Sequence, residues 1–265
     1  MKYPIVIPSR GRAQEVITLD RMPVELHPHV HLFTLEEESK AYFDRYGDTG
    51  THILCSSTKA DRISKKRQKM AQWVREETGA PYFWMMDDDL TFFEKYEEGG
   101  RLWMMDTADE FEAMFTSTED MMDAEPDRFC AIGISLRQGN NQLDWPYVDN
   151  VRLIRCGLFN TEAFLGCEHN RIDFMGDFDV MLQMLRAGYD NRVRSDYAQD
   201  QRATNAVGGC ETSRTAEVMD RVAEELAALH DPFVKTKMKK NKTGPLAERK
   251  DVTIYWKKAR ASADA

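Results

Sequence analysis

Three consecutive carboxylates, Asp87, Asp88 and Asp89, directly follow the apolar run from Tyr82 to Met86. The run predicts a buried strand. Because alternate residues of a strand face opposite ways, Asp87 and Asp89 are expected on one side of its end and Asp88 on the other. Carboxylate oxygens are the ligands that Mg2+ and Mn2+ prefer, and these ions in turn bridge phosphates. A solvated acidic turn or a helix N-cap is the alternative interpretation.

A second carboxylate group, Asp177 and Asp179, opens a predicted helix that ends at Gly188. Four apolar residues recur on one face of this helix: Phe178, Met181, Leu182 and Leu185. Asp177 is therefore expected in the first turn, where a negative charge is favoured and the carboxylate is held rigidly. A plain N-cap is the alternative for Asp177.

The elements that position these carboxylates alternate along the first ninety residues. Strands are expected at Tyr3–Pro8, Val30–Leu35, His52–Cys55 and Tyr82–Met86, with helices at Glu36–Tyr46 and Asp61–Thr78. This alternation predicts an α/β sandwich with a mainly parallel central sheet. Ligands bind at the carboxyl ends of the strands in such sheets, so we expect the Ser9–Arg12 turn and the aspartates at one edge.

The pattern changes after the aspartates. Thr107 and Glu110 form a capping box that opens a helix to about Met122. Further elements are expected in this order: strands Phe129–Leu136 and Val151–Cys156, an extended polar loop Ser195–Arg214, a helix Thr215–Leu229, and an edge strand Val252–Trp256. A polar loop between the first two of these strands carries Trp145 and Tyr147, which could line an acceptor site or plug the core.

Length and composition favour one globular unit. The chain has 265 residues, of which 42% are apolar and 31% charged. No run reaches the roughly 18 apolar residues that a membrane helix needs, and arginines stand where a signal peptide would be apolar, so a cytoplasmic protein is expected. The five cysteines are odd in number and lack a Cys-x-x-Cys pair, which argues against a disulfide framework and a zinc site.

The net charge of -9 is unevenly distributed. Residues 235–260 hold ten Lys or Arg against Glu248 and Asp251, while residues 1–234 hold 26 basic and 42 acidic residues. We therefore expect a catalytic domain over 1–234 and a basic segment over 235–265 that packs on it or extends it. The segment could hold a polyanion or a nucleotide diphosphate, through Lys235 and Lys237 among others, or form a solvated tail.

Taken in order, these features resemble the glycosyltransferases of the GT-A fold. The resemblance runs from about Tyr3 to Tyr189 and rests on the opening strand with its Pro8 and polar turn, on a basic helix before the aspartates, and on the later acidic helix start. Gly176 stands where the family's Glu-Asp motif has Glu. Softer motifs resemble the phage-type branch associated with TET/JBP enzymes, which glycosylates hydroxymethylated DNA bases: Ile-Pro-Ser-Arg-Gly-Arg at 7–12, the triple Asp, Gly-Gly-Cys at 208–210 and His-Asp-Pro-Phe-Val-Lys at 230–235.

The resemblance implies a metal-dependent transfer, with inversion, from a nucleotide sugar, in particular a UDP-sugar, to the hydroxyl of a hydroxymethylated pyrimidine in DNA. It implies Mn2+ or Mg2+ held by Asp87, Asp89 and His230, and Asp177 as the catalytic base with Asp179 as the second choice. The residues that it implies for the donor are Pro8, Ser9, Arg10, Arg12, Arg67, Asp87, Asp88, Lys235 and Lys237.

Three other interpretations stay open. The acceptor could be a glycan or a small molecule. A nucleotidyltransferase would also use paired aspartates and a metal, but it would ordinarily show a Gly-rich loop after the first strand, where this chain has the single Gly11. A non-catalytic nucleic-acid-binding protein could use the basic helix and the basic segment alone, although the acidic body and the triple Asp count against it.

Overall fold

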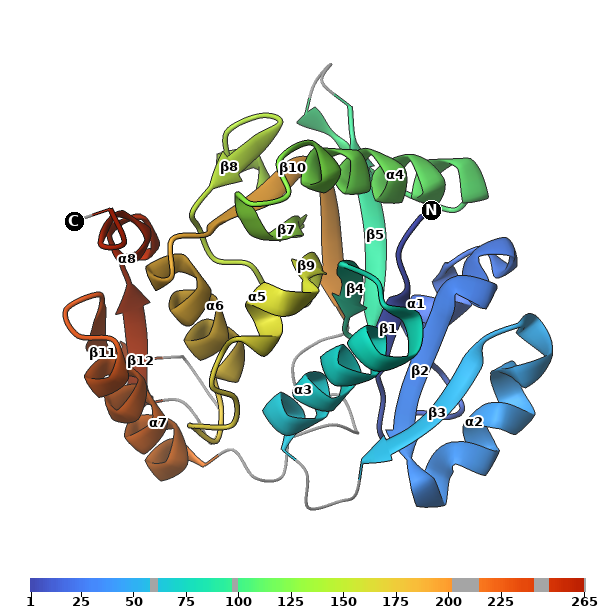
Figure 1. Cartoon of the computed structure of the whole chain (residues 1–265), viewed down its shortest axis with the longest axis horizontal. Helices are drawn as coiled ribbons and strands as arrows, with labels where there is room; N and C mark the ends of the chain where they lie inside the picture. The colour runs from blue at the N-terminus through green and yellow to red at the C-terminus, as the bar shows by residue number, and fades with distance from the viewer. Residues whose placement is uncertain (58–61, 97–99, 202–214, 241–247, 265) are drawn as a thin grey trace.

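The computed structural model describes residues 1–57, 62–96, 100–201, 215–240 and 248–264. Its main feature is a ten-stranded sheet in the order β3-β2-β1-β4-β9-β7-β10-β5-β6, with β8 paired to β10 (Figure 1). The strands of this sheet are β1 Ile5–Pro8, β2 Val30–Leu35, β3 His52–Ser57, β4 Tyr82–Met86, β5 Leu90–Lys95, β6 Leu102–Met104, β7 Phe129–Leu136, β8 Tyr147–Asp149, β9 Cys156–Asn160 and β10 Asp190–Gln201. The helices are α1 Ile17–Arg21, α2 Ser39–Tyr46, α3 Ile63–Trp73, α4 Ala108–Ala124, α5 Thr161–Leu165, α6 Gly176–Arg186, α7 Ala216–Leu229 and α8 Trp256–Ala261.

The predicted α/β sandwich with a mainly parallel sheet is confirmed. Strands β3, β2, β1 and β4 pair in parallel, as do β7 and β10, whereas β9 and β5 run against their neighbours. The carboxyl ends of β1 and β4 therefore lie at the same edge of the sheet. This edge receives both the Ser9–Arg12 turn and the three aspartates.

Helices cover both faces of the sheet. Alternate residues of the central strands point to opposite faces, so each strand contributes side chains to two apolar cores. Ile5 and Trp84 pack into a core with α1, α2 and α4, whereas Val6 and Met85 pack into a second core with α3, α5 and α6. Both cores are apolar and almost fully buried, which explains why β1 and β4 read as continuous apolar runs.

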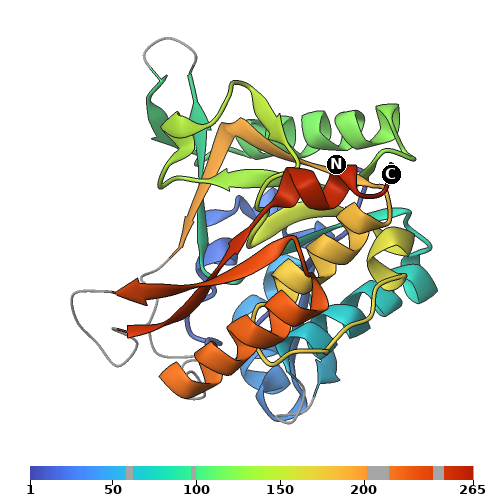
Figure 2. The same cartoon turned by 90° about the vertical axis from the view of Figure 1, so that its left-hand side faces the viewer.

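The C-terminal residues form a separate layer beside α6. Strands β11 Val234–Lys240 and β12 Glu248–Ile254 make an antiparallel hairpin that packs against α7, and α8 follows on the outside of α6 (Figures 1 and 2). A third apolar cluster joins the four elements through Leu182 of α6, Leu226 of α7, Val252 of β12 and Ala259 of α8. The basic segment is thus largely structured, although residues 241–247 lie outside the described ranges.

Most predicted elements are confirmed within a residue or two, and the capping box of Thr107 and Glu110 is present at the start of α4. The predicted strand Val151–Cys156 was wrong: the chain from 151 to 155 is irregular, Arg155 has a φ of 69°, and β9 begins only at Cys156. The polar loop expected from Ser195 was also wrong as far as Gln201, because β10 continues to that residue between β7 and β5. Residues 202–214 lie outside the described part.

Two smaller differences follow from pairing. The predicted C-terminal strand begins at Glu248 and pairs with β11 alone, not with the edge of the large sheet. Tyr147 lies in a short strand, where Arg192 stacks on its ring at 3.6 Å, and Trp145 lies next to Lys95 with 41% of its surface exposed. Neither aromatic residue plugs the core.

Candidate active site

The turn after β1 and the turn after β4 are bonded to each other at the expected edge. The Ser9 hydroxyl donates to Asp88 Oδ2 at 2.5 Å. Arg12 Nη1 donates to Asp88 Oδ1 at 2.5 Å and to Asp89 Oδ2 at 3.0 Å. These bonds confirm that the two sequence motifs meet, and they show how adjacent carboxylates are tolerated: an arginine supplies positive charge between two of them.

Asp88 is the buried member of the aspartate cluster, with 6% of its surface exposed. Burial raises the pKa of its carboxyl to about 6, and the charge of Arg12 opposes that shift. Because its two oxygens accept bonds from Ser9 and Arg12, Asp88 holds the first turn against the second. Burial likewise raises the pKa of Asp89, again opposed by Arg12.

Asp87 faces a different part of the site. Arg67 Nη2 on α3 donates to Asp87 Oδ1 at 2.8 Å, and the Asp87 backbone N–H donates to the carbonyl of Arg155 at 2.9 Å. Burial lowers the pKa of the Arg155 guanidinium, and the carboxylates of Asp87 and Asp89 both oppose that shift. Asp87 and Asp89 therefore act on one guanidinium, which places a cation beside the predicted metal ligands.

The predicted three-residue metal site is not formed. Among the described residues no group of three or more His, Cys, Asp or Glu side chains is arranged to hold a metal ion. Asp87 and Asp89 could still serve a Mg2+ or Mn2+ ion, because such ions are commonly held by one or two carboxylates and complete their shell with phosphate oxygens and water. The donor chemistry of the pair fits the ion, and the ion itself stays a prediction.

His230 lies elsewhere and was wrongly grouped with the aspartates. It is fully buried, and its Nε2 lies 2.8 Å from Asp179 Oδ1. Arg171 forms a two-pronged ion pair with the same carboxylate, with Nε 3.1 Å from Oδ2, and Arg186 approaches His230 Nδ1 at 3.3 Å. Hydrogen bonds from these partners lower the pKa of Asp179, which burial alone would raise. The cluster ties α6 to the end of α7.

Asp177 lies on the other side of α6 and lines a pocket with Arg67 and Arg155. The pocket encloses a cavity of about 40 Å³. Ser64 and His169 add polar groups, and the remaining lining is mostly apolar: Met85, Leu153, Ile154, Cys156, Phe159, Phe164, Gly176, Val180, Met181 and Met184. The pocket thus joins the candidate base to the arginine that binds Asp87.

Gly176 explains how α6 approaches α3 so closely. A Cβ at this position would lie 2.1 Å from the Ser64 hydroxyl oxygen and 3.2 Å from Ser64 Cβ. The space that a side chain at 176 needs is therefore occupied by Ser64. Asp177 follows in the first turn of α6, as predicted.

Sequence reasoning missed several residues of the site. Arg155 gave no signal, because its apolar neighbours suggested a strand. Lys66 stands next to Arg67 on the basic helix and could have been found from that pattern: it is 6% exposed, and its ammonium donates to the carbonyl of Ser9 at 3.0 Å. Ser64 and His169 lie among residues whose spacing carried no chemical pattern.

The other residues predicted to bind the donor are divided between two places. Pro8 ends β1 at the site, and Arg10 is exposed in the turn beside it. Lys235 and Lys237 lie on the hairpin, which packs on α7 and not on the turns that carry Ser9 and the aspartates.

No helix in the described part of the chain has the length and apolar character needed to cross a lipid bilayer.

Comparison with known proteins points to one family. Residues 3–209 match the family model of the TET-Associated Glycosyltransferase. The chain is 25% identical over 237 residues to a beta-glucosyl-HMC-alpha-glucosyl-transferase of Enterobacteria phage T2, and the match covers 83% of this chain and 79% of that protein.

Solved structures are more distant. A mannose-1-phosphate geranyltransferase of Thermus thermophilus has 13% identity and a TM-score of 0.45, over 88% of this chain and 81% of that chain. A protein described as a glucose-1-phosphate thymidylyltransferase of Bacillus anthracis, in complex with a sucrose, has 11% identity and a TM-score of 0.41, over 73% of this chain and 90% of that chain.

Proposed function

Because the chain belongs to the TET-associated glycosyltransferase family, we propose that this glycosyltransferase moves a sugar from a nucleotide-sugar donor, in particular a UDP-sugar, to a hydroxymethylated pyrimidine in DNA. One observation supports the site assignment: Asp177, Arg67 and Arg155 line one pocket, and Arg67 also donates to Asp87 of the aspartate turn at 2.8 Å. A donor at the turn and an acceptor hydroxyl at Asp177 would then be neighbours.

The donor's diphosphate would bind among the arginines of the turn. Arg12 and Arg67 are held by the aspartates at 2.5 to 3.0 Å, so their guanidinium groups are fixed before the substrate arrives. Fixed positive charge near the leaving oxygen stabilises the charge that grows there as the sugar departs. Arg155 adds a third guanidinium beside Asp87 and Asp89.

A divalent cation held by Asp87 and Asp89 would supply further electrostatic stabilisation of the leaving diphosphate. In this proposal the two carboxylates would lie beside the place where that charge develops. Asp88 is assigned a different role, because both of its oxygens already hold the turn that carries Ser9 and Arg12.

Asp177 is the proposed catalytic base. Its carboxylate lines the pocket, where it would accept the proton of the acceptor hydroxyl as that oxygen attacks the anomeric carbon. Asp179 is a poor base by comparison, because it is 1% exposed and its oxygens accept from Arg171 and His230. Attack from the face opposite the diphosphate would invert the anomeric configuration.

The acceptor has two candidates. One is the hydroxymethyl group of the pyrimidine itself. The other is a hydroxyl of a sugar already attached to that group, since the phage T2 relative is named for alpha-glucosyl transfer to beta-glucosyl-HMC. The two acceptors differ in size by one hexose, and both would present an alcohol to the catalytic carboxylate.

The test supplies three duplexes of one sequence, with cytosine, 5-hydroxymethylcytosine or its β-glucosylated form, together with Mn2+ and a panel of nucleotide sugars. Mass analysis of the digested nucleosides shows which acceptor gains a hexose. Asp177→Asn should retain donor binding while transfer falls by at least about a hundredfold. Sugar transfer to a glycan but to none of the duplexes would contradict the proposal. Full transfer by Asp177→Asn would contradict the assignment of Asp177 as the catalytic base.

A further inference from the structure

The hairpin sorts its charges by the alternation of its strands. The pairing of Lys235 with Thr253, Lys237 with Asp251 and Lys239 with Arg249 places these residues on one face. The opposite face carries Val234 and Val252, which are buried in the cluster with α7. The lysine face is therefore the one turned away from α7.

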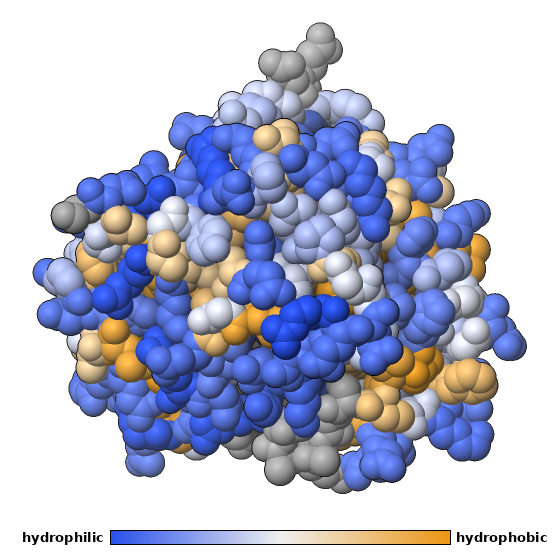
Figure 3. All heavy atoms as spheres, in the orientation of Figure 1, coloured by the Kyte–Doolittle hydropathy of each residue, from blue (hydrophilic) through white to orange (hydrophobic). Residues whose placement is uncertain are grey.

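The lysine face is positively charged and accessible. Every residue of β11 after Val234 is exposed. Strands β11 and β12 together hold six Lys or Arg against Glu248 and Asp251. Asp251 lies 3.2 Å from the Lys239 ammonium and compensates one charge of this face. Figure 2 shows the hairpin extending away from the body, and Figure 3 shows mainly hydrophilic atoms on the face in view.

An exposed aromatic ring continues the lysine face at the base of the hairpin. Tyr255 has 37% of its surface exposed, and the ammonium groups of Lys235 and Lys258 lie 5.9 and 5.2 Å from its ring centre. Aromatic rings among cations are typical of surfaces that bind unpaired, unstacked nucleotides, since the cations bind phosphates while the ring offers a stacking surface.

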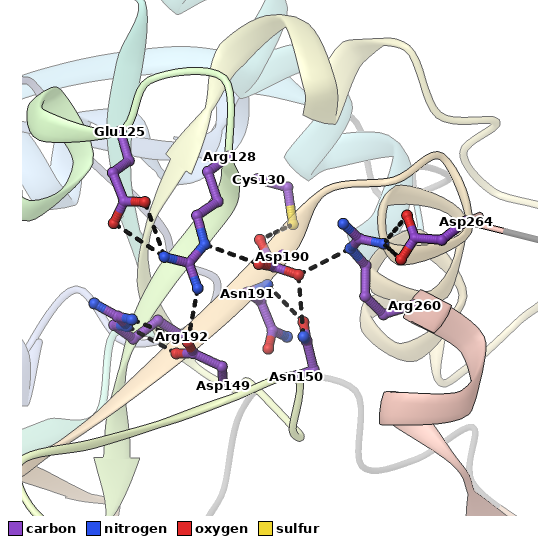
Figure 4. A network of polar contacts seen from close by, with 10 residues as sticks. All are labelled: Glu125, Arg128, Cys130, Asp149, Asn150, Asp190, Asn191, Arg192, Arg260 and Asp264. Carbon is purple, nitrogen blue, oxygen red and sulfur yellow. Dashed lines mark hydrogen bonds and ion pairs between the residues drawn. The ribbon is translucent and has the colours of Figure 1, made fainter. Parts of the chain in front are cut away.

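The hairpin is fixed relative to the candidate base. Trp256, just after β12, contacts the ring of Phe178 at 5.7 Å, and Phe178 is the neighbour of Asp177. One turn further along α8, Arg260 forms an ion pair with Asp190 at 2.8 Å, within the polar network shown in Figure 4. These contacts hold the lysine face at a set distance from the pocket.

We infer that the lysine face of the hairpin (Lys235, Lys237, Lys239 and Arg249, with Tyr255) binds the phosphate backbone of duplex DNA beside the base that is modified. The inference rests on the proposed function for its substrate class. Residues at i and i+2 are about 6.7 Å apart, so the three lysines span roughly 13 Å. Since DNA rises 3.4 Å per nucleotide, this span matches about four nucleotides of one strand. A two-stranded ribbon is also narrow enough to enter the major groove.

The test measures binding of the full-length protein to a fluorescent duplex as salt is raised. Lys235→Gln, Lys237→Gln and Lys239→Gln are combined in one variant. If each lysine contacts one phosphate, the slope of log K against log salt should lose about 2.7 units, and the fall in affinity between 50 and 200 mM salt should shrink about 40-fold. A variant with arginine at the three positions should keep the slope, because charge and not lysine identity sets it.

The matched control neutralises three exposed cations on α1 and α2, at the opposite end of the molecule (Figure 1): Arg21, Lys40 and Arg45. This control removes the same charge and should leave the slope unchanged. An equal loss of slope in the control would mean that net charge alone acts, and an unchanged slope in the hairpin variant would overturn the inference. The inference would also be overturned if the hairpin variant bound the nucleotide sugar more weakly in the absence of DNA but bound DNA as tightly as the wild type.

The binding result does not depend on sugar transfer. Phosphate contacts carry no sequence information, so unmodified and hydroxymethylated duplexes should show the same change of slope. Failure of the wild-type protein to add sugar to any duplex would refute the proposed acceptor, and the binding slopes would still decide whether the hairpin holds DNA.

Discussion

Gly176→Ala tests whether the close approach of α6 to α3 positions the candidate base. The new Cβ would meet the Ser64 hydroxyl oxygen at 2.1 Å and Ser64 Cβ at 3.2 Å. Rotation of the Ser64 side chain can relieve the first contact, but the second requires the helices to move by a few tenths of an ångström. Overpacking of this kind costs about 1 to 3 kcal/mol, and the helix preference of Ala over Gly returns up to about 1 kcal/mol.

The expected net loss of about 1 to 2 kcal/mol should lower Tm by roughly 2 to 8 °C in a protein of this size. Transfer should fall more steeply than stability, because Asp177 is the next residue and small displacements of a catalytic group are costly. Urea unfolding and sugar transfer to hydroxymethylated DNA measure the two effects on the same protein preparations.

Ser64→Gly provides the matched background. It removes both atoms that the new methyl group would meet, so Gly176→Ala should be neutral or stabilising there, and part of the lost transfer should return. The coupling energy of this double-mutant cycle should be about 1 to 3 kcal/mol. If Gly176→Ala costs the same in both backgrounds, the contact with Ser64 does not set the position of α6.

Three further expectations follow from other contacts. Asp89→Asn should lower Mn2+-stimulated transfer by about a hundredfold without unfolding the protein, because Arg12 keeps its bond to Asp88, and full activity in excess chelator would contradict the metal role. Arg171→Ala should lower the free energy of unfolding by about 3 kcal/mol, since it leaves the Asp179 carboxylate buried with less compensation, and an unchanged urea midpoint would refute this. Burial lowers the pKa of His31 to about 4, so the stability that its neutral form contributes is present above pH 6.5 and is lost as pH falls towards 4. Urea unfolding at several pH values should show that His31→Gln loses less stability over that range than the wild type. Equal losses in the two proteins would contradict this role of His31.

Local patterns in the sequence were sufficient for much of the fold. The apolar runs of β1 and β4 mark strands buried on both faces, and the capping box at Thr107 marks the start of α4. The rule that parallel strands present their carboxyl ends at one edge also predicted that the Ser9 turn lies beside the aspartates. These features depend on residues close together in the chain or on the direction of a strand.

The errors arose where pairing across the chain decides the structure. Residues 151–155 are mostly apolar, which is typical of a strand, but they lie in an irregular segment, because β9 pairs with β4 and β7 only from Cys156 onward. Gln201 lies at the end of a polar stretch that reads as a loop, yet β10 is held there by β5. The composition of a polar segment does not predict a strand when the strands that pair with it come from other parts of the chain.

The candidate site shows the same division. The sequence places Asp177 and Asp179 two positions apart on a helix, so they must face different ways, and it supplies the aspartate turn, the basic helix and the family resemblance. Only the tertiary structure decides that Asp177 faces the pocket while Asp179 faces His230 and Arg171. The physical reason is that a helix fixes the angle between its side chains, whereas the surfaces that meet them are set by packing against α3 and α7, whose residues lie far away in the chain.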